Sequence, residues 1–506
     1  MIKKTGILLI LLSTLSCTLL KPIPQPKNEF RGVWVATVVN IDWPKSGTDE
    51  IAKQQQDFLN ILDFYEQLNF NAVIVQIRTA GDSFYDSSYA PWSRFLTGKE
   101  GNPPKGEFDM LTWMIDESHA RGFEYHAWLN PYRATFDLKT ELLGATHDFN
   151  LHPEWMLKYG KKYYYDPGLP EVRKKLVKIM AEVVKHYDVD GIHFDDYFYP
   201  YKIKDEIFQD ANSYAYYALP NQTLEDWRRS NVDSLIMNIH STIKQEKPWV
   251  QFGVSPFGVW KNSATDPMGS DTKAGQTTYE DLYADPLTWM KKGWVDYLVP
   301  QVYWSMDLPV ASHSKIVKWW SNHSTNTNLY IGNGAYKIRN NSDKAWDRKK
   351  ELPDQIRLSR TTTEVGGNVL FSAKSLMDKH QDVVKYLKRK YYKNKVLSPI
   401  SPLTGNHEKP SIGVTTVNRK KDSATITINS NTDIRYALVY TSGKKKKANY
   451  PIHKLLTKVP VRNHQITLNN DQLRKKRQLA LTVINRYGQE SDPILIHLNQ
   501  NNDKKE

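Results

Sequence analysis

Cysteine is almost missing from this sequence, in which Cys17 is the only one among 506 residues. A single cysteine can form no disulfide within the chain, so a disulfide framework is excluded whatever the redox state of the compartment. Long apolar runs are missing as well, and no segment after Cys17 is long and apolar enough to cross a bilayer. The hydrophobic share of 40% and the charged share of 25% are those of an ordinary soluble protein with a sizeable core.

The signatures of three function classes are also missing. No glycine-rich nucleotide loop follows the first predicted strand, and no histidines and acids have the spacing of a zinc hydrolase. We therefore predict no cofactor and no metal. The net charge of +14 would suit a polyanionic partner, but much of the excess lies in late runs such as 444–447 and 474–477. Solvated faces and loops usually carry such runs, and without a nucleic-acid module we predict no nucleic-acid partner.

The N-terminus has the pattern of an export signal. Lys3 and Lys4 precede an apolar run at 7–12, and serine and threonine residues lead up to Cys17. Cys17 resembles the lipobox cysteine of bacterial lipoproteins, whose thiol is acylated; a plain signal peptide with an incidental cysteine is the alternative. We predict a lipoprotein signal peptide over 1–17 and a proline-rich tether over 18–27. The protein would then be lipid-anchored in the bacterial cell envelope, on the periplasmic side of the outer membrane.

Strand and helix patterns alternate between the tether and residue 395. Near-continuous apolar strands between amphipathic helices are typical of a parallel sheet covered on both faces. Eight such units predict a (β/α)8 TIM barrel over 28–395, with a doubly wound sheet as the alternative. The predicted strands are 30–38, 72–78, 124–130, the start of 190–200, 251–255, 297–304, 329–334 and 367–372. The predicted helices are 51–68, 110–120, 171–186, 224–244, 279–292, 316–321, 352–361 and 383–391.

The pattern changes near the prolines at 399 and 402. Helical spacing disappears, and turn-rich segments separate short runs of alternating apolar and polar residues. This pattern is typical of a small β-sandwich of fibronectin-III type, which we predict over 400–498, followed by a polar tail over 499–506. The alternating runs are 424–428, 436–440, 465–468 and 479–484.

The most distinctive stretch is 190–200 (DGIHFDDYFYP), a short apolar strand that ends in two adjacent carboxylates. Side chains alternate along a strand, so His193 and Asp195 should face one way, and Phe194 and Asp196 the other. An isolated pair of aspartates is more often a solvated turn. Here aromatic residues surround the pair and it follows a buried strand, which is where catalytic side chains collect in a βα-barrel.

Polar and aromatic side chains follow the other predicted strands too, and the chain is rich in aromatic residues, with 15 Trp and 29 Tyr. Amides and arginines bind hydroxyl groups, while indole and phenol rings present flat apolar faces to sugar rings. This mixture is suited to a polyhydroxylated ligand. The predicted binding residues at the barrel mouth are Asp42, Trp43, Gln76, Arg78, Asn130, Arg133, His193, Tyr197, Trp260, Gln301, Tyr303 and Trp304.

Cleavage of a glycosidic bond needs two carboxyl groups, one to protonate the leaving oxygen and one to act as nucleophile or base. Asp195 and Asp196 are neighbours on a strand and diverge, so they cannot fill both roles. Asp196 should mainly position its neighbours, and the partner of Asp195 should come from another strand end. Asp307 is the leading candidate, followed by Asp42 and Asp266, although a structural salt bridge or a loop cap would explain each of them equally well.

Four motifs resemble those of the glycosyl-hydrolase-like 10 family, in the same order along the chain. They are 30–37 (FRGVWVAT), 190–200, 254–260 (VSPFGVW) and 300–304 (PQVYW). The resemblance extends over residues 28–390. It implies a bacterial, often lipid-anchored barrel with a glycosidase fold, and it implies cleavage of peptidoglycan glycan strands, particularly strands stripped of stem peptides.

More distantly, 191–195 resembles the fourth-strand motif of α-amylase-type barrels, whose final aspartate is the nucleophile, and this role carries over to Asp195. His193 stands where those enzymes have an arginine, and no glutamate ends the fifth strand to serve as their acid. The sequence thus predicts a monomeric glycoside hydrolase of cell-wall glycan with a two-carboxylate mechanism. The alternatives are a non-catalytic glycan-binding lipoprotein and a hydrolase of another polysaccharide, such as an α-glucan.

Overall fold

The computed structural model describes residues 25–106, 108–420, 422–442, 452–469, 473 and 478–498. Cys17, the predicted signal peptide, most of the predicted tether, both basic runs and the polar tail lie outside these residues. Within the described part of the chain, no helix has both the length and the apolar character needed to span a bilayer.

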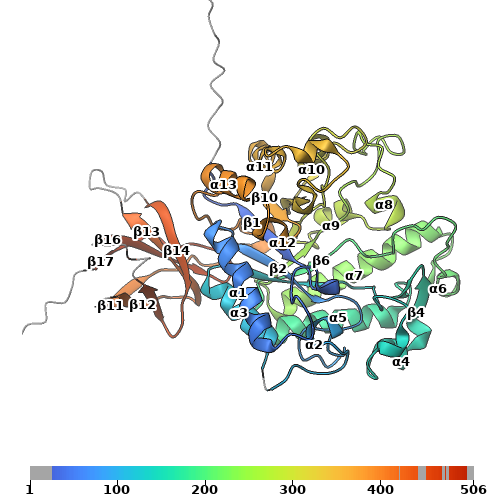
Figure 1. Ribbon diagram of the computed structural model, residues 1–506, viewed down its shortest axis with the longest axis horizontal. Helices are drawn as coiled ribbons and strands as arrows, with labels where there is room; N and C mark the ends of the chain where they lie inside the picture. The colour runs from blue at the N-terminus through green and yellow to red at the C-terminus, as the bar shows by residue number, and fades with distance from the viewer. Residues whose placement is uncertain are drawn as a thin grey trace, which may run out of the picture.

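A closed barrel of eight parallel strands forms the centre of the molecule (Figure 1), which confirms the predicted (β/α)8 fold. Around the barrel the strand order is β1, β10, β9, β8, β7, β6, β3, β2, so each strand pairs with the neighbours expected of a TIM barrel. The strands are β1 (Phe30–Val35), β2 (Ala72–Arg78), β3 (Glu124–Leu129), β6 (Gly191–Phe194), β7 (Gln251–Val254), β8 (Tyr297–Leu298), β9 (Asn328–Asn333) and β10 (Val365–Leu370).

Helices surround the barrel, close to the predicted positions. The main ones are α1 (Ile51–Gln67), α3 (Met110–Ala120), α5 (Pro170–His186), α7 (Leu224–Glu246), α9 (Pro286–Lys292), α10 (His313–His323), α11 (Glu351–Thr361) and α13 (Gln381–Lys390). One prediction is wrong in detail, because the helix expected at 279–292 is two short helices, α8 (Thr278–Asp281) and α9. Tyr283 has a positive φ of 51° between them, and Pro286 starts the second helix, since it has no N–H to continue the first.

Alternate residues of each strand point into the barrel or out toward the helices. In β2, Ala72 and Ile74 pack inside the barrel with Trp34, whereas Val73 and Val75 pack outward against the helices. Both sets are buried, which is why the strand sequences are almost continuously apolar.

The loops at the mouth contain elements that the sequence did not predict. A two-stranded hairpin, β4 (Met156–Tyr159) and β5 (Lys162–Tyr165), lies in the long connection after β3, and Gly160 takes a positive φ of 57° at its turn. The short helices are α2 (Arg94–Thr97), α4 (Asp148–Leu151), α6 (Ala211–Tyr217) and α12 (Lys374–Met377).

The C-terminal strands form two antiparallel sheets that lie to one side of the barrel (Figure 1). The sheets share one core, in which Ile426 and Leu468 of one sheet pack with Val439 and Leu481 of the other, as in a β-sandwich. One sheet contains β11 (Gly413–Arg419), β12 (Ser423–Asn429) and β15 (Gln465–Asn469). The other contains β14 (Ile452–Pro460), β13 (Ile434–Ser442), β16 (Gln478–Asn485) and β17 (Ile494–His497).

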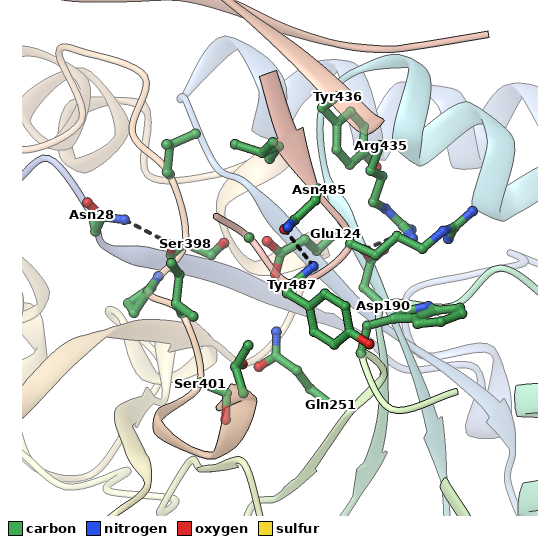
Figure 2. A pocket seen from close by; sticks show the side chains of 18 of the residues that line it. Asn28, Glu124, Asp190, Gln251, Ser398, Ser401, Arg435, Tyr436, Asn485 and Tyr487 are labelled. Atoms are coloured by element: carbon green, nitrogen blue, oxygen red, sulfur yellow. Dashed lines mark hydrogen bonds and ion pairs between the residues drawn. The ribbon is translucent and has the colours of Figure 1, made fainter. Parts of the chain in front are cut away.

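The sandwich contacts the N-terminal ends of the barrel strands, at the end opposite Asp195. Arg435 of β13 forms an ion pair of 2.9 Å with Asp190, which directly precedes β6. Figure 2 shows the small cavity of about 80 Å³ between the two parts, with Asp190, Glu124, Arg435 and Tyr487 in its wall. Because charged groups from both parts are paired there, this cavity belongs to the joint between barrel and sandwich.

Candidate functional site

Asp195 directly follows β6, and two hydrogen bonds fix its carboxylate. Oδ1 accepts one from Nε2 of Gln301, at 2.9 Å, and one from the backbone N–H of Asp196, at 2.8 Å. The same Gln301 nitrogen donates to the carbonyl of Ser255, at 3.0 Å, so three neighbouring strand ends hold one another in place. The structure thus brings together Gln301 and Asp195, two of the predicted site residues, at the barrel mouth.

Asp195 faces a cavity of about 290 Å³, near the lower end of the volumes found for ligand pockets. Of the described residues that line it, Asp195 is the only carboxylate. Its predicted lining residues include Gln76, Asn130, Arg133, Tyr197, Gln301 and Tyr303, and those that the sequence did not predict include Trp34, Trp128, Tyr336 and Phe371. The described residues contain no group of three or more His, Cys, Asp or Glu side chains placed to hold a metal ion.

Asp196 lies behind the cavity, as strand alternation predicts. It is 2% exposed, and its Oδ2 accepts a hydrogen bond from the hydroxyl of Tyr201. Burial and the adjacent charge of Asp195 raise the pKa of Asp196 well above its ordinary value. Burial also raises the pKa of Asp195, against the hydrogen bonds from Asp196 and Gln301 and the charge of Arg133. The two carboxyl groups therefore resist ionising together. The pair keeps one proton at pH values above the usual pKa range of aspartate.

Gln301→Leu should raise the pKa of Asp195 further, because it removes an amide N–H that stabilises the ionised carboxylate. The acid limb of the pH dependence of kcat/KM should then move upward by about one pH unit, the value of one hydrogen bond to a charged group. Gln76→Leu is the matched control, because the Gln76 amide lines the same cavity but accepts from the backbone N–H groups of Thr37 and Val38. An acid limb that moves equally in both variants would contradict the conclusion that the Gln301 amide stabilises the ionised Asp195 carboxylate.

His193 lies one layer below the cavity and is fully buried, which corrects its prediction as a binding residue. The indole N–H of Trp34 can only donate, so Nε2 of His193, at 3.2 Å, accepts and the ring is neutral. Burial and the nearby His126 lower the pKa of His193 well below its ordinary value, which agrees with a neutral ring. Nδ1 of His193 then donates to the hydroxyl of Tyr297, at 3.1 Å, and that hydroxyl donates to Nδ1 of His126, at 2.8 Å.

This chain of hydrogen bonds runs through the barrel interior and fixes the orientation of Trp34 in the cavity wall. Two glycines leave room for it, because a Cβ atom on Gly253 would collide with the ring of Tyr297 and one on Gly191 with the ring of His126.

Tyr297→Phe should lower the free energy of unfolding by roughly 2 kcal/mol, because it leaves buried ring nitrogens of His193 and His126 without a partner. Tyr132→Phe is the matched control, since the hydroxyl of Tyr132 is also buried but has no hydrogen-bond partner in the described part of the chain. That variant should change the free energy by less than about 0.5 kcal/mol. Urea unfolding of both variants makes the comparison, and equal losses would refute the chain of hydrogen bonds.

Besides His193, five of the predicted binding residues lie outside the cavity. Trp43 is fully buried in the core, where it packs on Phe58 and donates to the carbonyl of Gln54. The guanidinium of Arg78 binds the carbonyl of Ala80 in the loop. The others are Asp42, which binds loop backbone, Trp260, whose indole donates to Asp285, and Trp304, which packs on Phe257.

The structure does not bring Asp307 to Asp195. Asp307 is exposed on a turn, because the segment before it is tied to α11 on the outside of the barrel. The carbonyl of Trp304 accepts from Gln355, and the N–H of Met306 donates to Glu351. Asp266 is also outside the cavity and forms an ion pair of 2.9 Å with Lys261.

Trp34 and Trp128 were missed because the prediction considered only the residues after each strand. Both are inward-facing residues of the strands themselves, so alternation along β1 and β3 was the signal that would have identified them. Tyr336 and Phe371 lie in the loops after β9 and β10, where no pattern in the sequence indicates which way a side chain points.

Comparison with known proteins identifies a family and several relatives that this chain resembles in sequence. The sequence profile described as glycosyl hydrolase-like 10 matches residues 29–348. Glycosyl hydrolase YngK of Bacillus subtilis (strain 168) is 42% identical over 435 residues, which are 84% of this chain and 85% of that protein. Glycosyl hydrolase DigH of Escherichia coli (strain K12) is 36% identical over 394 residues, which are 72% of this chain and 88% of that protein.

Among solved structures, the PgaB (BpsB) glycoside hydrolase domain from Bordetella bronchiseptica is 12% identical, with a TM-score of 0.47 over 72% of this chain and 99% of that chain. The family assignment itself depends on the sequence matches. The profile covers more than half of the chain, and both relatives are matched over most of their length. The chain therefore belongs to the glycosyl hydrolase-like 10 family.

Proposed function

We propose that this protein hydrolyses glycosidic bonds of cell-wall glycan in the cavity at the barrel mouth, with Asp195 as the reacting carboxylate. The observation that carries the proposal is the position of Asp195, at a strand end of a glycosidase-type barrel. Gln301 holds it beside Arg133 and the rings of Trp34 and Tyr303. Polar groups around one carboxylate and flat rings for sugar faces are what a glycan-cleaving site needs.

In this proposal the ionised Asp195 meets the positive charge that develops on the anomeric carbon as its bond to the leaving oxygen breaks. Asp196 acts behind it, because burial and the charge of Asp195 raise its pKa, against the hydrogen bond from Tyr201, and so keep the shared proton on the side away from the cavity. The leaving oxygen must take a proton and the anomeric carbon must take a water hydroxyl to complete hydrolysis.

A second candidate function is glycan binding without cleavage. It is favoured by one observation, that Asp195 is the only carboxylate among the described residues lining the cavity, whereas a two-carboxylate mechanism uses a pair. The same cavity would then hold a sugar without an acid to protonate its leaving oxygen.

One experiment separates these candidates. The purified full chain is incubated with purified peptidoglycan glycan strands, and with starch in parallel, and new reducing ends are measured. We expect reducing ends from the glycan strands only. Their absence, together with measurable binding of the strands, would favour the glycan-binding function, and release from starch would favour an α-glucan hydrolase.

We also propose that Cys17 carries a lipid anchor that holds the protein in the bacterial cell envelope. The proposal is supported by the basic, apolar and small-residue pattern that precedes this cysteine. Cys17→Ser should move the protein from the membrane fraction to the soluble fraction, as measured by fractionation and immunoblotting. A wild-type protein that is already soluble would contradict the anchor.

A further inference from the structure

The last helix of the barrel, α13, carries a cluster of cations on its outer surface. The helix lies at the outside of the barrel beside α11 (Figure 1), and it packs inward through Val383, Val384 and Leu387. The opposite surface and the turn after the helix are basic. We call this surface the basic face, and its residues are Lys385, Lys388, Arg389, Lys390 and Lys393.

The cations of the basic face are unpaired. Within the described part of the chain, none of their five charged groups has a hydrogen bond or an ion pair, and four of the five side chains are exposed. Lys388 is half-buried. Burial and the positive charges of Lys395, Arg31 and Lys454 lower its pKa to about 8, so the charges around it are positive as well.

The acids on neighbouring elements face other cations. Asp382, the acid of α13, pairs with Arg339 at 2.7 Å, and Glu66 of α1 pairs with Lys395 at 3.2 Å. The other acids nearby are Glu29 with Arg31 and Arg360, Glu351 with Arg348, Asp354 with Arg348, Lys350 and Arg357, and Asp42 and Asp378 with Lys374 and Lys379. The basic face therefore keeps an excess of positive charge after these pairs are counted.

The predicted tether joins the described chain beside the basic face. The side chain of Gln25 donates a hydrogen bond to the backbone carbonyl of Lys390, at 3.2 Å. Residues 18–24 separate Cys17 from Gln25. An extended chain advances about 3.5 Å per residue, so this connection spans at most roughly 30 Å. A lipid on Cys17 would thus hold the basic face close to a bilayer.

We propose that the basic face binds the surface of an anionic phospholipid bilayer. Clustered lysine and arginine side chains are attracted to anionic headgroups over about the Debye length, so a face held near the bilayer is where such a cluster acts. The distance argument rests on the lipid anchor proposed above, whereas the charge argument is independent of it.

This contact would leave the site of Asp195 open. Gln25 lies near the start of β1, and Asp195 follows the end of β6. Because the strands are parallel, these two positions are at opposite ends of the barrel. A glycan strand could therefore reach the mouth while the basic face stays on the bilayer.

The test measures binding to lipid vesicles and excludes the anchor. It uses residues 18–506, which contain the whole described structure and lack Cys17. Sedimentation measures binding to vesicles of phosphatidylcholine alone and to vesicles in which phosphatidylglycerol replaces part of it. The double variant K385Q/R389Q is compared with K174Q/K178Q, which removes the same charge from two exposed residues of α5 with the same spacing.

We expect the wild type to bind the vesicles that contain phosphatidylglycerol and not those of phosphatidylcholine alone, and to lose this binding at high salt. K385Q/R389Q should weaken binding roughly tenfold to thirtyfold, because each cation near an anionic surface contributes about a fivefold factor. K174Q/K178Q should weaken it by less than about twofold, because α5 would lie beyond the range of the surface charge.

Equal losses in the two double variants would overturn the proposal, because the net charge of +14 would then explain the binding. Absence of binding by the wild type, or equal binding to both kinds of vesicle, would also overturn it. If K385Q/R389Q weakened binding of glycan strands and left vesicle binding unchanged, the basic face would be a glycan site instead. Release of reducing ends and fractionation of Cys17→Ser test hydrolysis and the anchor separately, so their failure would be distinguishable from failure of the basic face.

Discussion

Asp195→Asn should abolish release of reducing ends from glycan strands, with a loss in kcat of roughly a thousandfold or more. The amide keeps the shape of the side chain but removes the negative charge that meets the developing oxocarbenium ion. Gln301 can still donate to the remaining oxygen at this position, so the cavity should keep its form. The measurement is kcat on glycan strands, with circular dichroism and thermal unfolding to show that the variant is folded.

Two further variants make this prediction specific. Asp307→Asn is the matched control, because Asp307 is an exposed aspartate near the mouth but outside the cavity, and it should retain wild-type turnover. Asp196→Asn should have an intermediate effect, because Asp196 touches Asp195 and Tyr201 but does not line the cavity. A folded Asp195→Asn variant with near-normal turnover would refute the assignment of Asp195.

The barrel and the position of Asp195 were predictable because both depend on local patterns. A strand that is buried on both faces must be almost continuously apolar, and its last residues must lie at the mouth. Asp195 and Gln301 lie one and three residues after the ends of β6 and β8, too close to their strands to point elsewhere.

Residues farther from a strand end were less predictable. After β1 the chain passes through a short 3-10 turn in which Val39 and Asn40 have positive φ values of 53° and 52°. This turn sends Trp43 into the core under α1 and leaves Asp42 to bind backbone. The same indole on an exposed loop would have been suited to bind the face of a sugar ring. The sequence alone does not distinguish a buried Trp43 from an exposed one. Asp307 was misplaced for the same reason.

The sandwich strands that escaped prediction, β11, β14 and β17, all lie at sheet edges, although the edge strand β15 was predicted. β11 has a mostly exposed surface and polar residues on both faces, whereas the edge strand β15 alternates between exposed and buried residues. The sequence of β11 has therefore no regular alternation to detect. The central strands β12, β13 and β16 do have one, since packing between the sheets requires it.

Arg435→Met should lower the free energy of unfolding by about 3 kcal/mol, because it removes a cation from a buried ion pair at the joint between barrel and sandwich (Figure 2). Asp190 and Arg435 have side chains that are only 10% and 9% exposed, so water cannot replace the lost partner. We expect a loss of unfolding free energy at the low end of the range for buried ion pairs, because Asp190 keeps two hydrogen bonds. They come from His119 and from the backbone N–H of Tyr125, both at 2.8 Å.

The pH dependence of this effect has a definite sign. Burial would raise the pKa of Asp190, but Arg435, His119 and Lys458 outweigh it and hold that pKa below its ordinary value. A carboxyl whose pKa is lowered by folding stabilises the protein above the pKa of the unfolded chain, and that contribution disappears as the pH falls through the folded value. The difference between wild type and Arg435→Met should therefore be full near neutral pH and shrink in acid.

Arg462→Met is the matched control for Arg435→Met, because Arg462 also pairs across the joint, with Asp116 at 3.2 Å, but both side chains are more than half exposed. It removes the same charge from the same sandwich and should cost less than about 1 kcal/mol, because exposed pairs contribute little. Denaturant unfolding of both variants at neutral and acid pH measures the two effects. Equal losses in the two variants would show that packing holds the sandwich against the N-terminal end of β6. The buried charge of Arg435 would then not be what stabilises this contact.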